Sequence, residues 1–206
     1  MAAEIPGWNF NEVRQASSDI WNQALGQIAV KGNNEKEKVK FYSALYNAHF
    51  LPRTFSDVDG SYPRFDGDGQ IMKMDHGTYY CDFSQWDTYR AVHPLFSILT
   101  PSRNGDMAHS LVLKGQQGGW LPIFPSWNSY TAAMIGDHCI AMIGDAIVKD
   151  TPGFDYEEAY TLMRKNAFEA NPDSASYRDG KGRRAMESYL KYNYVPLEDQ
   201  VTEAFH

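Results

Sequence analysis

One stretch, residues 118–138, concentrates aromatic rings and short polar side chains between a Gly-Gly pair and a run of small residues. Indole and phenol rings offer flat apolar faces that suit the C–H faces of a sugar, and the polar groups can bond its hydroxyls. Pro122 and Pro125 leave a second interpretation open, in which a rigid loop uses its aromatic rings to fill the core. The candidate residues are Trp120, Trp127, Tyr130, Asn128, Ser129, Asp137 and His138.

Trp86 and Asp87 form a second candidate pair, at the start of a predicted helix. Ser84 lies three residues before Asp87, which is the spacing of a capping box, and in that case Asp87 bonds a backbone amide. In the other interpretation Trp86 stacks on a sugar and Asp87 accepts a hydrogen bond from a hydroxyl. The spacing alone favours the cap over the ligand role.

The dipeptide Asp137-His138 could supply a general base, because a carboxylate stands beside an imidazole. A serine or cysteine hydrolase would also need a nucleophile on a sharp turn, and the chain contains no G-x-S-x-G string. His138 is therefore more simply interpreted as a buried, hydrogen-bonded histidine than as a catalytic base. His93, which precedes Pro94, is likewise expected in the core, where it distorts a helix.

Five aspartates lie between positions 57 and 75, and Asp57-x-Asp59-Gly60 is similar to the start of a calcium loop. An EF-hand would place a bidentate Glu at loop position 12, where this chain has Asp68, and it would need flanking helices. Aspartates that close turns through their own side chains explain the pattern better. They are Asp57, Asp59, Asp66, Asp68 and Asp75.

Composition limits the class of protein. The 206 residues are 43% hydrophobic and carry a net charge of −7, which allows a substantial core and disfavours a nucleic-acid partner. The basic string at 181–184 is too short to change that. Cys81 and Cys139 have no zinc-site spacing and could be one disulfide or two reduced core thiols. No export signal and no membrane-spanning run is expected within this sequence.

Apolar periodicity predicts helices separated by aromatic and Asp/Gly-rich loops, and therefore an all-α array of helical hairpins. The first two helices, at 9–30 and 35–50, should pack as an antiparallel hairpin. Residues 51–82 read as a long ordered loop with a short hairpin around 67–77. Further helices are expected at about 84–99, 105–115, 130–149, 156–168 and 181–192, the fourth with a capping box at Asp155 and Glu158.

Five strings, at 41–67, 79–95, 118–138, 153–167 and 189–198, together resemble glycoside hydrolase family 92, the calcium-dependent exo-acting α-mannosidases. The resemblance implies an (α/α)6 barrel, normally preceded by a β-sandwich, that removes terminal α-linked mannose with inversion. It implies Ca²⁺ as cofactor, bound by oxygen ligands, and a mannose-containing glycan or glycoprotein as substrate. It also implies an extracellular, periplasmic, vacuolar or lysosome-like location for the parent protein.

Two departures from the family pattern are visible. Family members carry a Glu general acid in an Asn-Glu-Thr string, and the aligned residues here are Ser129, Tyr130 and Thr131. A phenol, with a pKa of about 10, donates a proton poorly near neutral pH. The segments that supply the base and a calcium-binding Glu would lie beyond His206, so residues 1–206 are expected to be the N-terminal portion of the helical catalytic domain, with apolar hairpin faces exposed.

The resulting hypothesis is a glycoside hydrolase of α-mannosides, of which this chain supplies the mannose-binding walls. The alternative is a non-catalytic carbohydrate-binding domain or a helical domain that has lost its activity, which Tyr130 and the missing base favour. No catalytic residue or metal ligand is assigned within the chain. The predicted substrate-binding residues are Trp86, Asp87, Trp127, Asn128, Tyr130 and His138.

Overall fold

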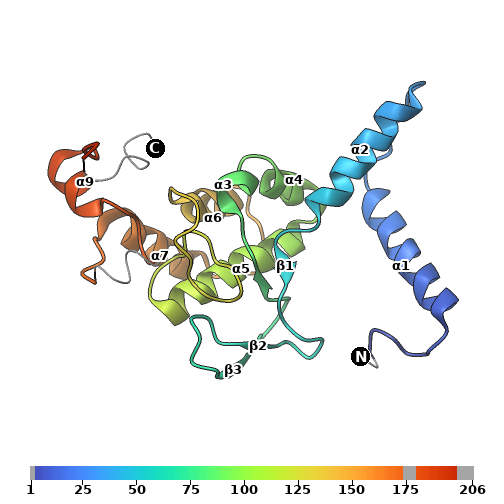
Figure 1. Ribbon diagram of the computed structural model, residues 1–206, viewed down its shortest axis with the longest axis horizontal. Coiled ribbons are helices and arrows are strands. Elements are labelled where there is room, and N and C mark those ends of the chain that lie inside the picture. The colour runs from blue at the N-terminus through green and yellow to red at the C-terminus, as the bar shows by residue number, and fades with distance from the viewer. Residues whose placement is uncertain (1–2, 174–179, 199–206) are drawn as a thin grey trace. The chain divides into compact units, whose positions relative to one another are not determined.

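The computed structural model describes residues 3–173 and 180–198, and the chain forms two compact units, Met1–Phe50 and Leu51–His206. The first unit contains two helices, α1 (Phe10–Leu25) and α2 (Glu35–Ala48) (Figure 1). Asn9 and Asn34 cap them by accepting backbone N–H bonds of their first turns.

Both helices end slightly before the predicted residues. The Tyr42 hydroxyl donates to the carbonyl of Ile28 at 3.0 Å and accepts the N–H of Val30 at 3.2 Å. These bonds hold the segment after α1 outside the helix, since its backbone groups are satisfied by a side chain of α2.

The two helices meet through Trp21, whose ring contacts those of Tyr46, His49 and Phe50. These contacts join the end of α1 to the end of α2, while the bonds of Tyr42 join the segment after α1 to the middle of α2. Later positions in the first segment thus meet earlier positions in α2, an order compatible with the predicted antiparallel hairpin. Helix α1 fully buries none of its residues: Phe10 and Ile20 are exposed, whereas Val13, Trp21 and Leu25 are partly buried.

The described part of the second unit contains four short strands as well as helices, so the all-α prediction is too simple. The hairpin predicted around 67–77 is formed by residues 61–73, and a second antiparallel pair joins residues 53–54 to 80–81. The strands are β1 (Arg53–Thr54), paired with β4 (Tyr80–Cys81), and β2 (Ser61–Pro63), paired with β3 (Ile71–Lys73).

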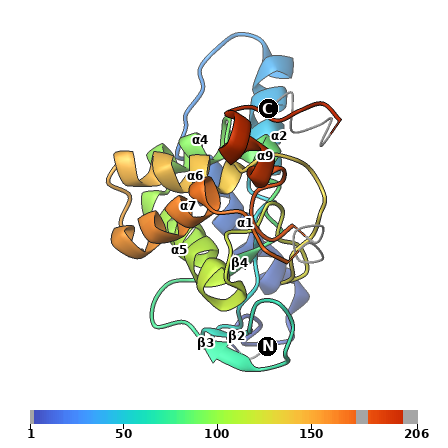
Figure 2. The ribbon, with the colours of Figure 1, turned by 90° about the vertical axis from the view of Figure 1, so that its left-hand side faces the viewer.

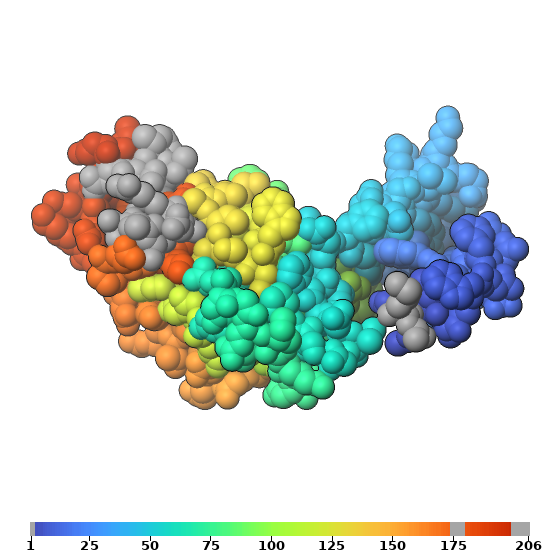
Figure 3. Space-filling view, turned by 60° about the horizontal axis from the view of Figure 1, so that its bottom comes forward, coloured from blue at the N-terminus to red at the C-terminus, as the bar shows by residue number. Residues whose placement is uncertain are grey.

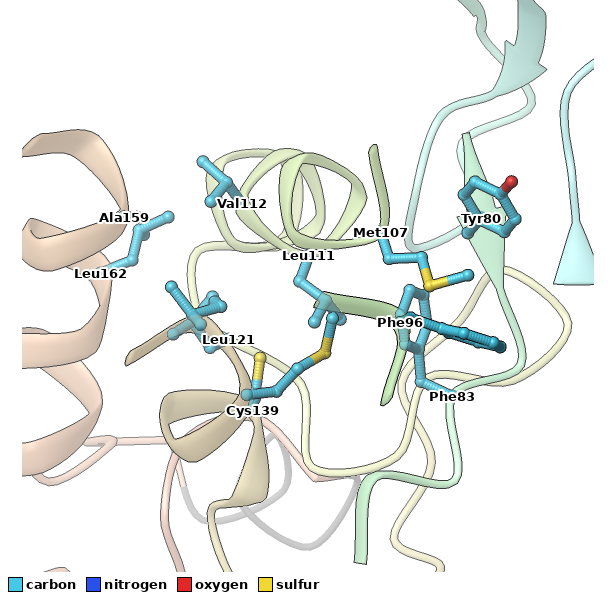
Figure 4. Packing of buried hydrophobic residues seen from close by; sticks show 12 residues of the cluster. Tyr80, Phe83, Phe96, Met107, Leu111, Val112, Leu121, Cys139, Ala159 and Leu162 are labelled. Carbon is cyan, nitrogen blue, oxygen red and sulfur yellow. The ribbon is translucent and has the colours of Figure 1, made fainter. Parts of the chain in front are cut away.

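Helix α5 (Pro101–Gly118) forms the centre of this unit and contacts β4 and three other helices. Two of these, α6 (His138–Val148) and α7 (Tyr156–Phe168), lie beside it in Figures 1 and 2. Apolar side chains from these elements surround it in one cluster (Figure 4). The other helices in the described part of this unit are α3 (Gln85–Thr88), α4 (Val92–Leu99) and α9 (Met186–Tyr192). The cluster includes Phe83, Phe96, Met107, Leu111, Leu121, Cys139, Met142, Ile143 and Leu162.

Helix α5 is longer than the predicted 105–115, because two of its glycines serve packing rather than termination. A Cβ on Gly105 would lie 1.8 Å from the carbonyl oxygen of Pro152, and one on Gly115 would lie 2.8 Å from a methyl of Leu162. Pro101 fits the first turn, where its missing N–H has no partner to lose. The helix thus continues through residues that usually end one.

The single helix predicted at 84–99 is two helices, α3 and α4. Pro94 in the first turn of α4 has no N–H to continue a helix from the preceding residues, which separates the two. His93 is buried and its Nδ1 lies 3.2 Å from Asn104 Oδ1, which confirms the predicted core position. Burial lowers its pKa to about 4.

The helix predicted at 130–149 begins only at His138. Met134 and Gly136 have φ of 63° and 78°, left-handed values that a helix cannot contain. Similarly, α9 begins at Met186 and not near 181, because Ala185 and Gly182 have φ of 57° and 79°.

Helix α7 matches its prediction, and the Asp155 side chain accepts the N–H groups of Glu157 and Glu158. The described part of the chain is therefore a helical array, and its closure into an (α/α)6 barrel stays a prediction. Within that part, no helix is both long and apolar enough to cross a membrane. Cys81 and Cys139 are buried free thiols, which settles the disulfide question.

Candidate functional site

Trp127 stands at the tip of a tight turn and is 77% exposed. Ser126 and Ser129 exchange two backbone hydrogen bonds, of 3.1 and 3.0 Å, around Trp127 and Asn128. Both central residues are left-handed, with φ of 48° and 58°, so the turn has the type I′ conformation that usually contains Asn or Gly. Tryptophan in this conformation costs about 1–2 kcal/mol, so surrounding contacts must hold it there.

Asp82, just after β4, supplies those contacts. Its Oδ1 accepts the Trp127 N–H at 2.8 Å and the Ser126 hydroxyl at 3.0 Å, while Oδ2 accepts Arg53 Nε at 2.7 Å. Burial would raise the pKa of this carboxyl, but the hydrogen bonds from Trp127, Arg53 and Ser126 hold it below its ordinary value. No pattern in the sequence distinguishes Asp82 from the other aspartates, and its role was not predicted.

Asn128 joins the turn to the strands. Its Oδ1 accepts the Tyr79 hydroxyl at 2.7 Å, and its Nδ2 donates to the carbonyls of Pro63 and Arg64 at 2.6 and 3.1 Å. In Figure 3 the surface of the loop that contains Asn128, in yellow, borders the surface of the segment around residues 63–64, in teal. Both amide hydrogens are thus engaged by the protein, and a sugar-binding role for Asn128 stays a prediction.

Tyr130, aligned with the family's general acid, is buried, and its hydroxyl is occupied by the backbone of Trp120. The hydroxyl donates to the Trp120 carbonyl at 2.5 Å and accepts its N–H at 3.2 Å. A Cβ on Gly118 would lie 2.2 Å from that hydroxyl, so glycine is needed for the close approach. Burial raises the pKa of Tyr130 above its ordinary value, which makes its phenol an even weaker acid.

A small polar hollow of about 220 Å³ opens beside Tyr130. Lys181 lies in it with Nζ 2.5 Å from Asp66 Oδ2 and 4.9 Å from the centre of the Tyr130 ring. Sites for drug-sized ligands measure roughly 300–1,000 Å³, so this hollow suits only a small polar group. It is lined by Asp66, Ser129, Tyr130, Thr131, Ala132 and Lys181.

The other predicted residues lie on α3 and at the start of α6, two helices in contact. The rings of Tyr89 and His138 stack with centres 4.4 Å apart and planes at 8°. The Arg90 guanidinium lies 4.8 Å from the centre of the Trp86 ring. The structure thus places Trp86, Asp87 and His138 on neighbouring elements, and Trp127, Asn128 and Tyr130 on one loop.

The capping box predicted at Ser84 and Asp87 is wrong in its detail. The Ser84 side chain does not cap α3, and its hydroxyl donates to Asp87 Oδ2 at 2.6 Å. A carboxylate with one short intramolecular bond still has acceptor capacity, which keeps a ligand role for Asp87 compatible with this geometry.

The aspartates of residues 57–75 do not converge on a calcium site. Asp59 accepts the N–H and hydroxyl of Ser61, and Asp68 bonds the Gln70 N–H and pairs with Arg64, as expected of turn-forming side chains. Among residues 3–173 and 180–198, the acid, imidazole and thiol groups that converge for a metal are those of one set, Asp75, His76 and His109. Two imidazoles suit Ca²⁺ poorly, so these residues do not fit the implied cofactor.

Comparisons with known proteins agree with the family resemblance of the sequence. The family GH92 α-mannosidase BT3965 from Bacteroides thetaiotaomicron superposes with a TM-score of 0.83 and 34% identity over 95% of this chain and 25% of its own. The same protein in complex with mannoimidazole superposes with a TM-score of 0.82 and 34% identity, over 95% of this chain and 24% of its own. The inverting mannosidase BT2199 from Bacteroides thetaiotaomicron VPI-5482 gives 0.82 and 28% over 94% of this chain and 26% of its own.

The chain therefore spans about a quarter of the length of the solved structures it matches. No curated protein sequence matches it. The family model of the glycosyl hydrolase family 92 catalytic domain, in contrast, matches residues 1–205. On this match over nearly all of its length, the chain belongs to glycosyl hydrolase family 92.

Proposed function

We propose that this chain forms the mannose-binding part of a glycoside hydrolase that releases terminal α-linked mannose from glycans by inverting, calcium-assisted hydrolysis. The observation that carries the proposal is the family match over residues 1–205, together with 34% identity to an α-mannosidase solved with mannoimidazole. Residues 1–206 would be the N-terminal portion of the helical catalytic domain. Its glycan substrates are met outside the cytoplasm or in a degradative compartment.

Trp127 is the residue whose geometry best fits a sugar contact. Its ring is exposed on a turn fixed at the backbone by Asp82, so the platform is presented with little conformational freedom to lose. Stacking on an aromatic ring buries the apolar C–H face of a sugar while its hydroxyls stay available for hydrogen bonds. Asp87 and His138 would supply such bonds from α3 and α6.

Inversion requires one carboxyl group that protonates the leaving oxygen and another that activates water on the opposite face. Tyr130 cannot serve as that acid while its hydroxyl is held by Trp120. We therefore assign proton donation to a residue other than Tyr130, and the base and a calcium-binding Glu to sequence outside residues 1–206.

A second candidate function is carbohydrate binding without turnover, and the position of Tyr130 favours it. A family site that keeps its sugar-contacting walls but replaces its acid with a buried phenol would still bind mannose. It would bind without cleaving the glycosidic bond.

The test is release of the aryl group from an aryl α-mannoside by the chain and by the longest protein that contains it, with and without a calcium chelator. Chelator-sensitive release, with the β-anomer of mannose as the first product by NMR, would support the inverting mannosidase. Saturable mannose binding without release would support the binding function. Trp127→Ala should weaken aryl-group release, or mannose binding where no release occurs, at least tenfold. Trp8→Ala, at another exposed tryptophan, should change neither.

A further inference from the structure

Asp75 and His76, in the loop between β3 and β4, meet His109 of α5. One ligand atom from each residue lies within 4.8 Å of the other two. The imidazole rings of His76 and His109 stack with centres 4.7 Å apart and planes at 17°. We propose that these three residues bind a divalent transition-metal ion, with Zn²⁺ the best fit. This site is separate from the implied calcium and independent of the proposed mannosidase function.

The hydrogen bonds of His76 leave one ring nitrogen ready for a metal. Its Nε2 lies 3.0 Å from the carbonyl oxygen of Gly153, which can only accept, so Nε2 carries a proton. In the neutral ring Nδ1 then presents a lone pair, as in metal-bound histidines whose other nitrogen donates to a carbonyl. That carbonyl fixes both the tautomer and the orientation of the ring.

Nδ1 of His76 faces the carboxylate of Asp75, with 3.0 Å between the nitrogen and Oδ1. Two lone-pair groups at this distance attract a proton or a metal cation between them. Zn²⁺ forms bonds of about 2.0–2.2 Å in a tetrahedral arrangement, which sets neighbouring ligand atoms roughly 3.3 Å apart. The observed pair is therefore already near the separation that zinc requires.

His109 supplies a third ligand from a rigid element. It is only 9% exposed, and its Nδ1 is buried without a hydrogen-bond partner among the described residues. Such a group is uncommon in native proteins and calls for a partner. The Asp75 side chain is 76% exposed, so its carboxylate can adjust toward His109 while the His76 ring keeps its bond to Gly153 and the helix stays in place.

The charge around the cluster favours a dication. Asp106 accepts the Thr78 N–H at 3.1 Å, and its carboxylate acts electrostatically on both imidazoles. Gly77 makes room for it, because a Cβ there would lie 2.2 Å from Asp106 Oδ1. The carboxyl groups of Asp75 and Asp106 thus both lie near the two imidazoles, a concentration of acidic groups that a cation would balance. Imidazole ligands select zinc, copper, nickel or cobalt over calcium.

The test is titration of the purified chain with Co²⁺ and Zn²⁺. We expect one site, with visible absorption typical of tetrahedral Co²⁺ that Zn²⁺ removes and excess Ca²⁺ leaves unchanged. Asp75→Asn and His76→Asn should each weaken Zn²⁺ binding at least tenfold. His109→Gln should do the same, but its burial makes a folding control by circular dichroism necessary.

The matched control is His49→Gln, which lies in the other unit of the chain and should leave affinity and spectrum unchanged. Unaltered Zn²⁺ affinity in both Asp75→Asn and His76→Asn would overturn the proposal, as would displacement of Co²⁺ by Ca²⁺ at equal concentration. Because binding is read without any substrate, failure of the metal site would leave the mannosidase proposal untouched, and the reverse also holds.

Discussion

The carboxylate of Asp82 accepts the backbone N–H of Trp127 at 2.8 Å, across 45 residues of sequence. One residue is almost fully buried and the other is the most exposed ring of its loop. The bond fixes the backbone of a left-handed turn and leaves the indole free. A rigid backbone under an exposed ring is the arrangement expected of a binding platform, because little order remains to be gained on binding.

Replacing Asp82 by Ala should lower the free energy of unfolding by about 2 kcal/mol, because the Trp127 N–H and the Ser126 hydroxyl lose their acceptor. Mannose affinity should fall as the turn loosens. Chemical denaturation and a binding titration measure the two effects. Asp59→Ala, in an exposed turn, should cost less than about 1 kcal/mol. Equal effects of the two substitutions would contradict the role given to Asp82.

The same carboxylate predicts acid sensitivity. Its pKa is lower in the folded chain than in the unfolded one, so its contribution to stability is complete above the unfolded value of about 4 and is lost as the pH falls below it. Between pH 5 and pH 3, the wild type should therefore lose more stability than Asp82→Asn does. Parallel losses in the two proteins, measured by urea denaturation, would count against this assignment.

Local signals predicted the parts of this fold that depend on neighbours in sequence. The Asp155 cap and the apolar periodicity of α2 and α7 gave usable boundaries. The failures arise where distant contacts decide. Residues 130–137 have helical composition, but Met134 and Gly136 adopt left-handed backbone angles.

The candidate site follows the same rule. The aromatic loop was visible from its composition, whereas the hydrogen bonds of Asp82 join residues 29 to 45 positions away. The cluster of Asp75, His76 and His109 depends on the packing of a loop against α5, and no known metal spacing predicts it.

Tyr130→Phe tests whether the aligned acid position is structural. The substitution removes a hydroxyl bonded twice to the Trp120 backbone, so we expect about 1–3 kcal/mol of destabilisation. If the protein hydrolyses α-mannosides, kcat should change less than threefold. The shape of the pH profile of kcat should stay the same. A loss of more than a hundredfold in kcat with the stability retained would instead make Tyr130 the proton donor.

Lys114 predicts stability that rises with pH. It is fully buried, donates to the Tyr80 carbonyl at 2.6 Å, and lies 3.6 Å from the centre of the Tyr79 ring. Burial lowers its pKa to about 7, whereas the unfolded value is about 10.4. Between these values the unfolded chain binds more protons, so stability should increase with pH by at most about 1.4 kcal/mol per unit.

The measurement for Lys114 is the free energy of unfolding of wild type minus that of Lys114→Met at pH 7, 8 and 9. The difference should grow with pH, because methionine does not titrate. Burial raises the pKa of the nearby Cys81 thiol, which is present in both proteins. Lys40→Met, at an exposed lysine, should leave the pH dependence unchanged. A difference that stays constant from pH 7 to 9 would mean that Lys114 titrates normally.

Two helix glycines should respond to alanine in opposite directions. At Gly105 the added Cβ would lie 1.8 Å from the backbone oxygen of Pro152, and a backbone atom cannot rotate away, so Gly105→Ala should destabilise by about 2–3 kcal/mol. At Gly144 the nearest atom is the terminal methyl of Met163 at 3.5 Å, an ordinary contact. Gly144→Ala should therefore stabilise by about 0.5–1 kcal/mol through helix propensity. Thermal denaturation of both variants checks the pair, and a stabilised Gly105→Ala would mean that α5 and residues 151–153 are not packed this closely.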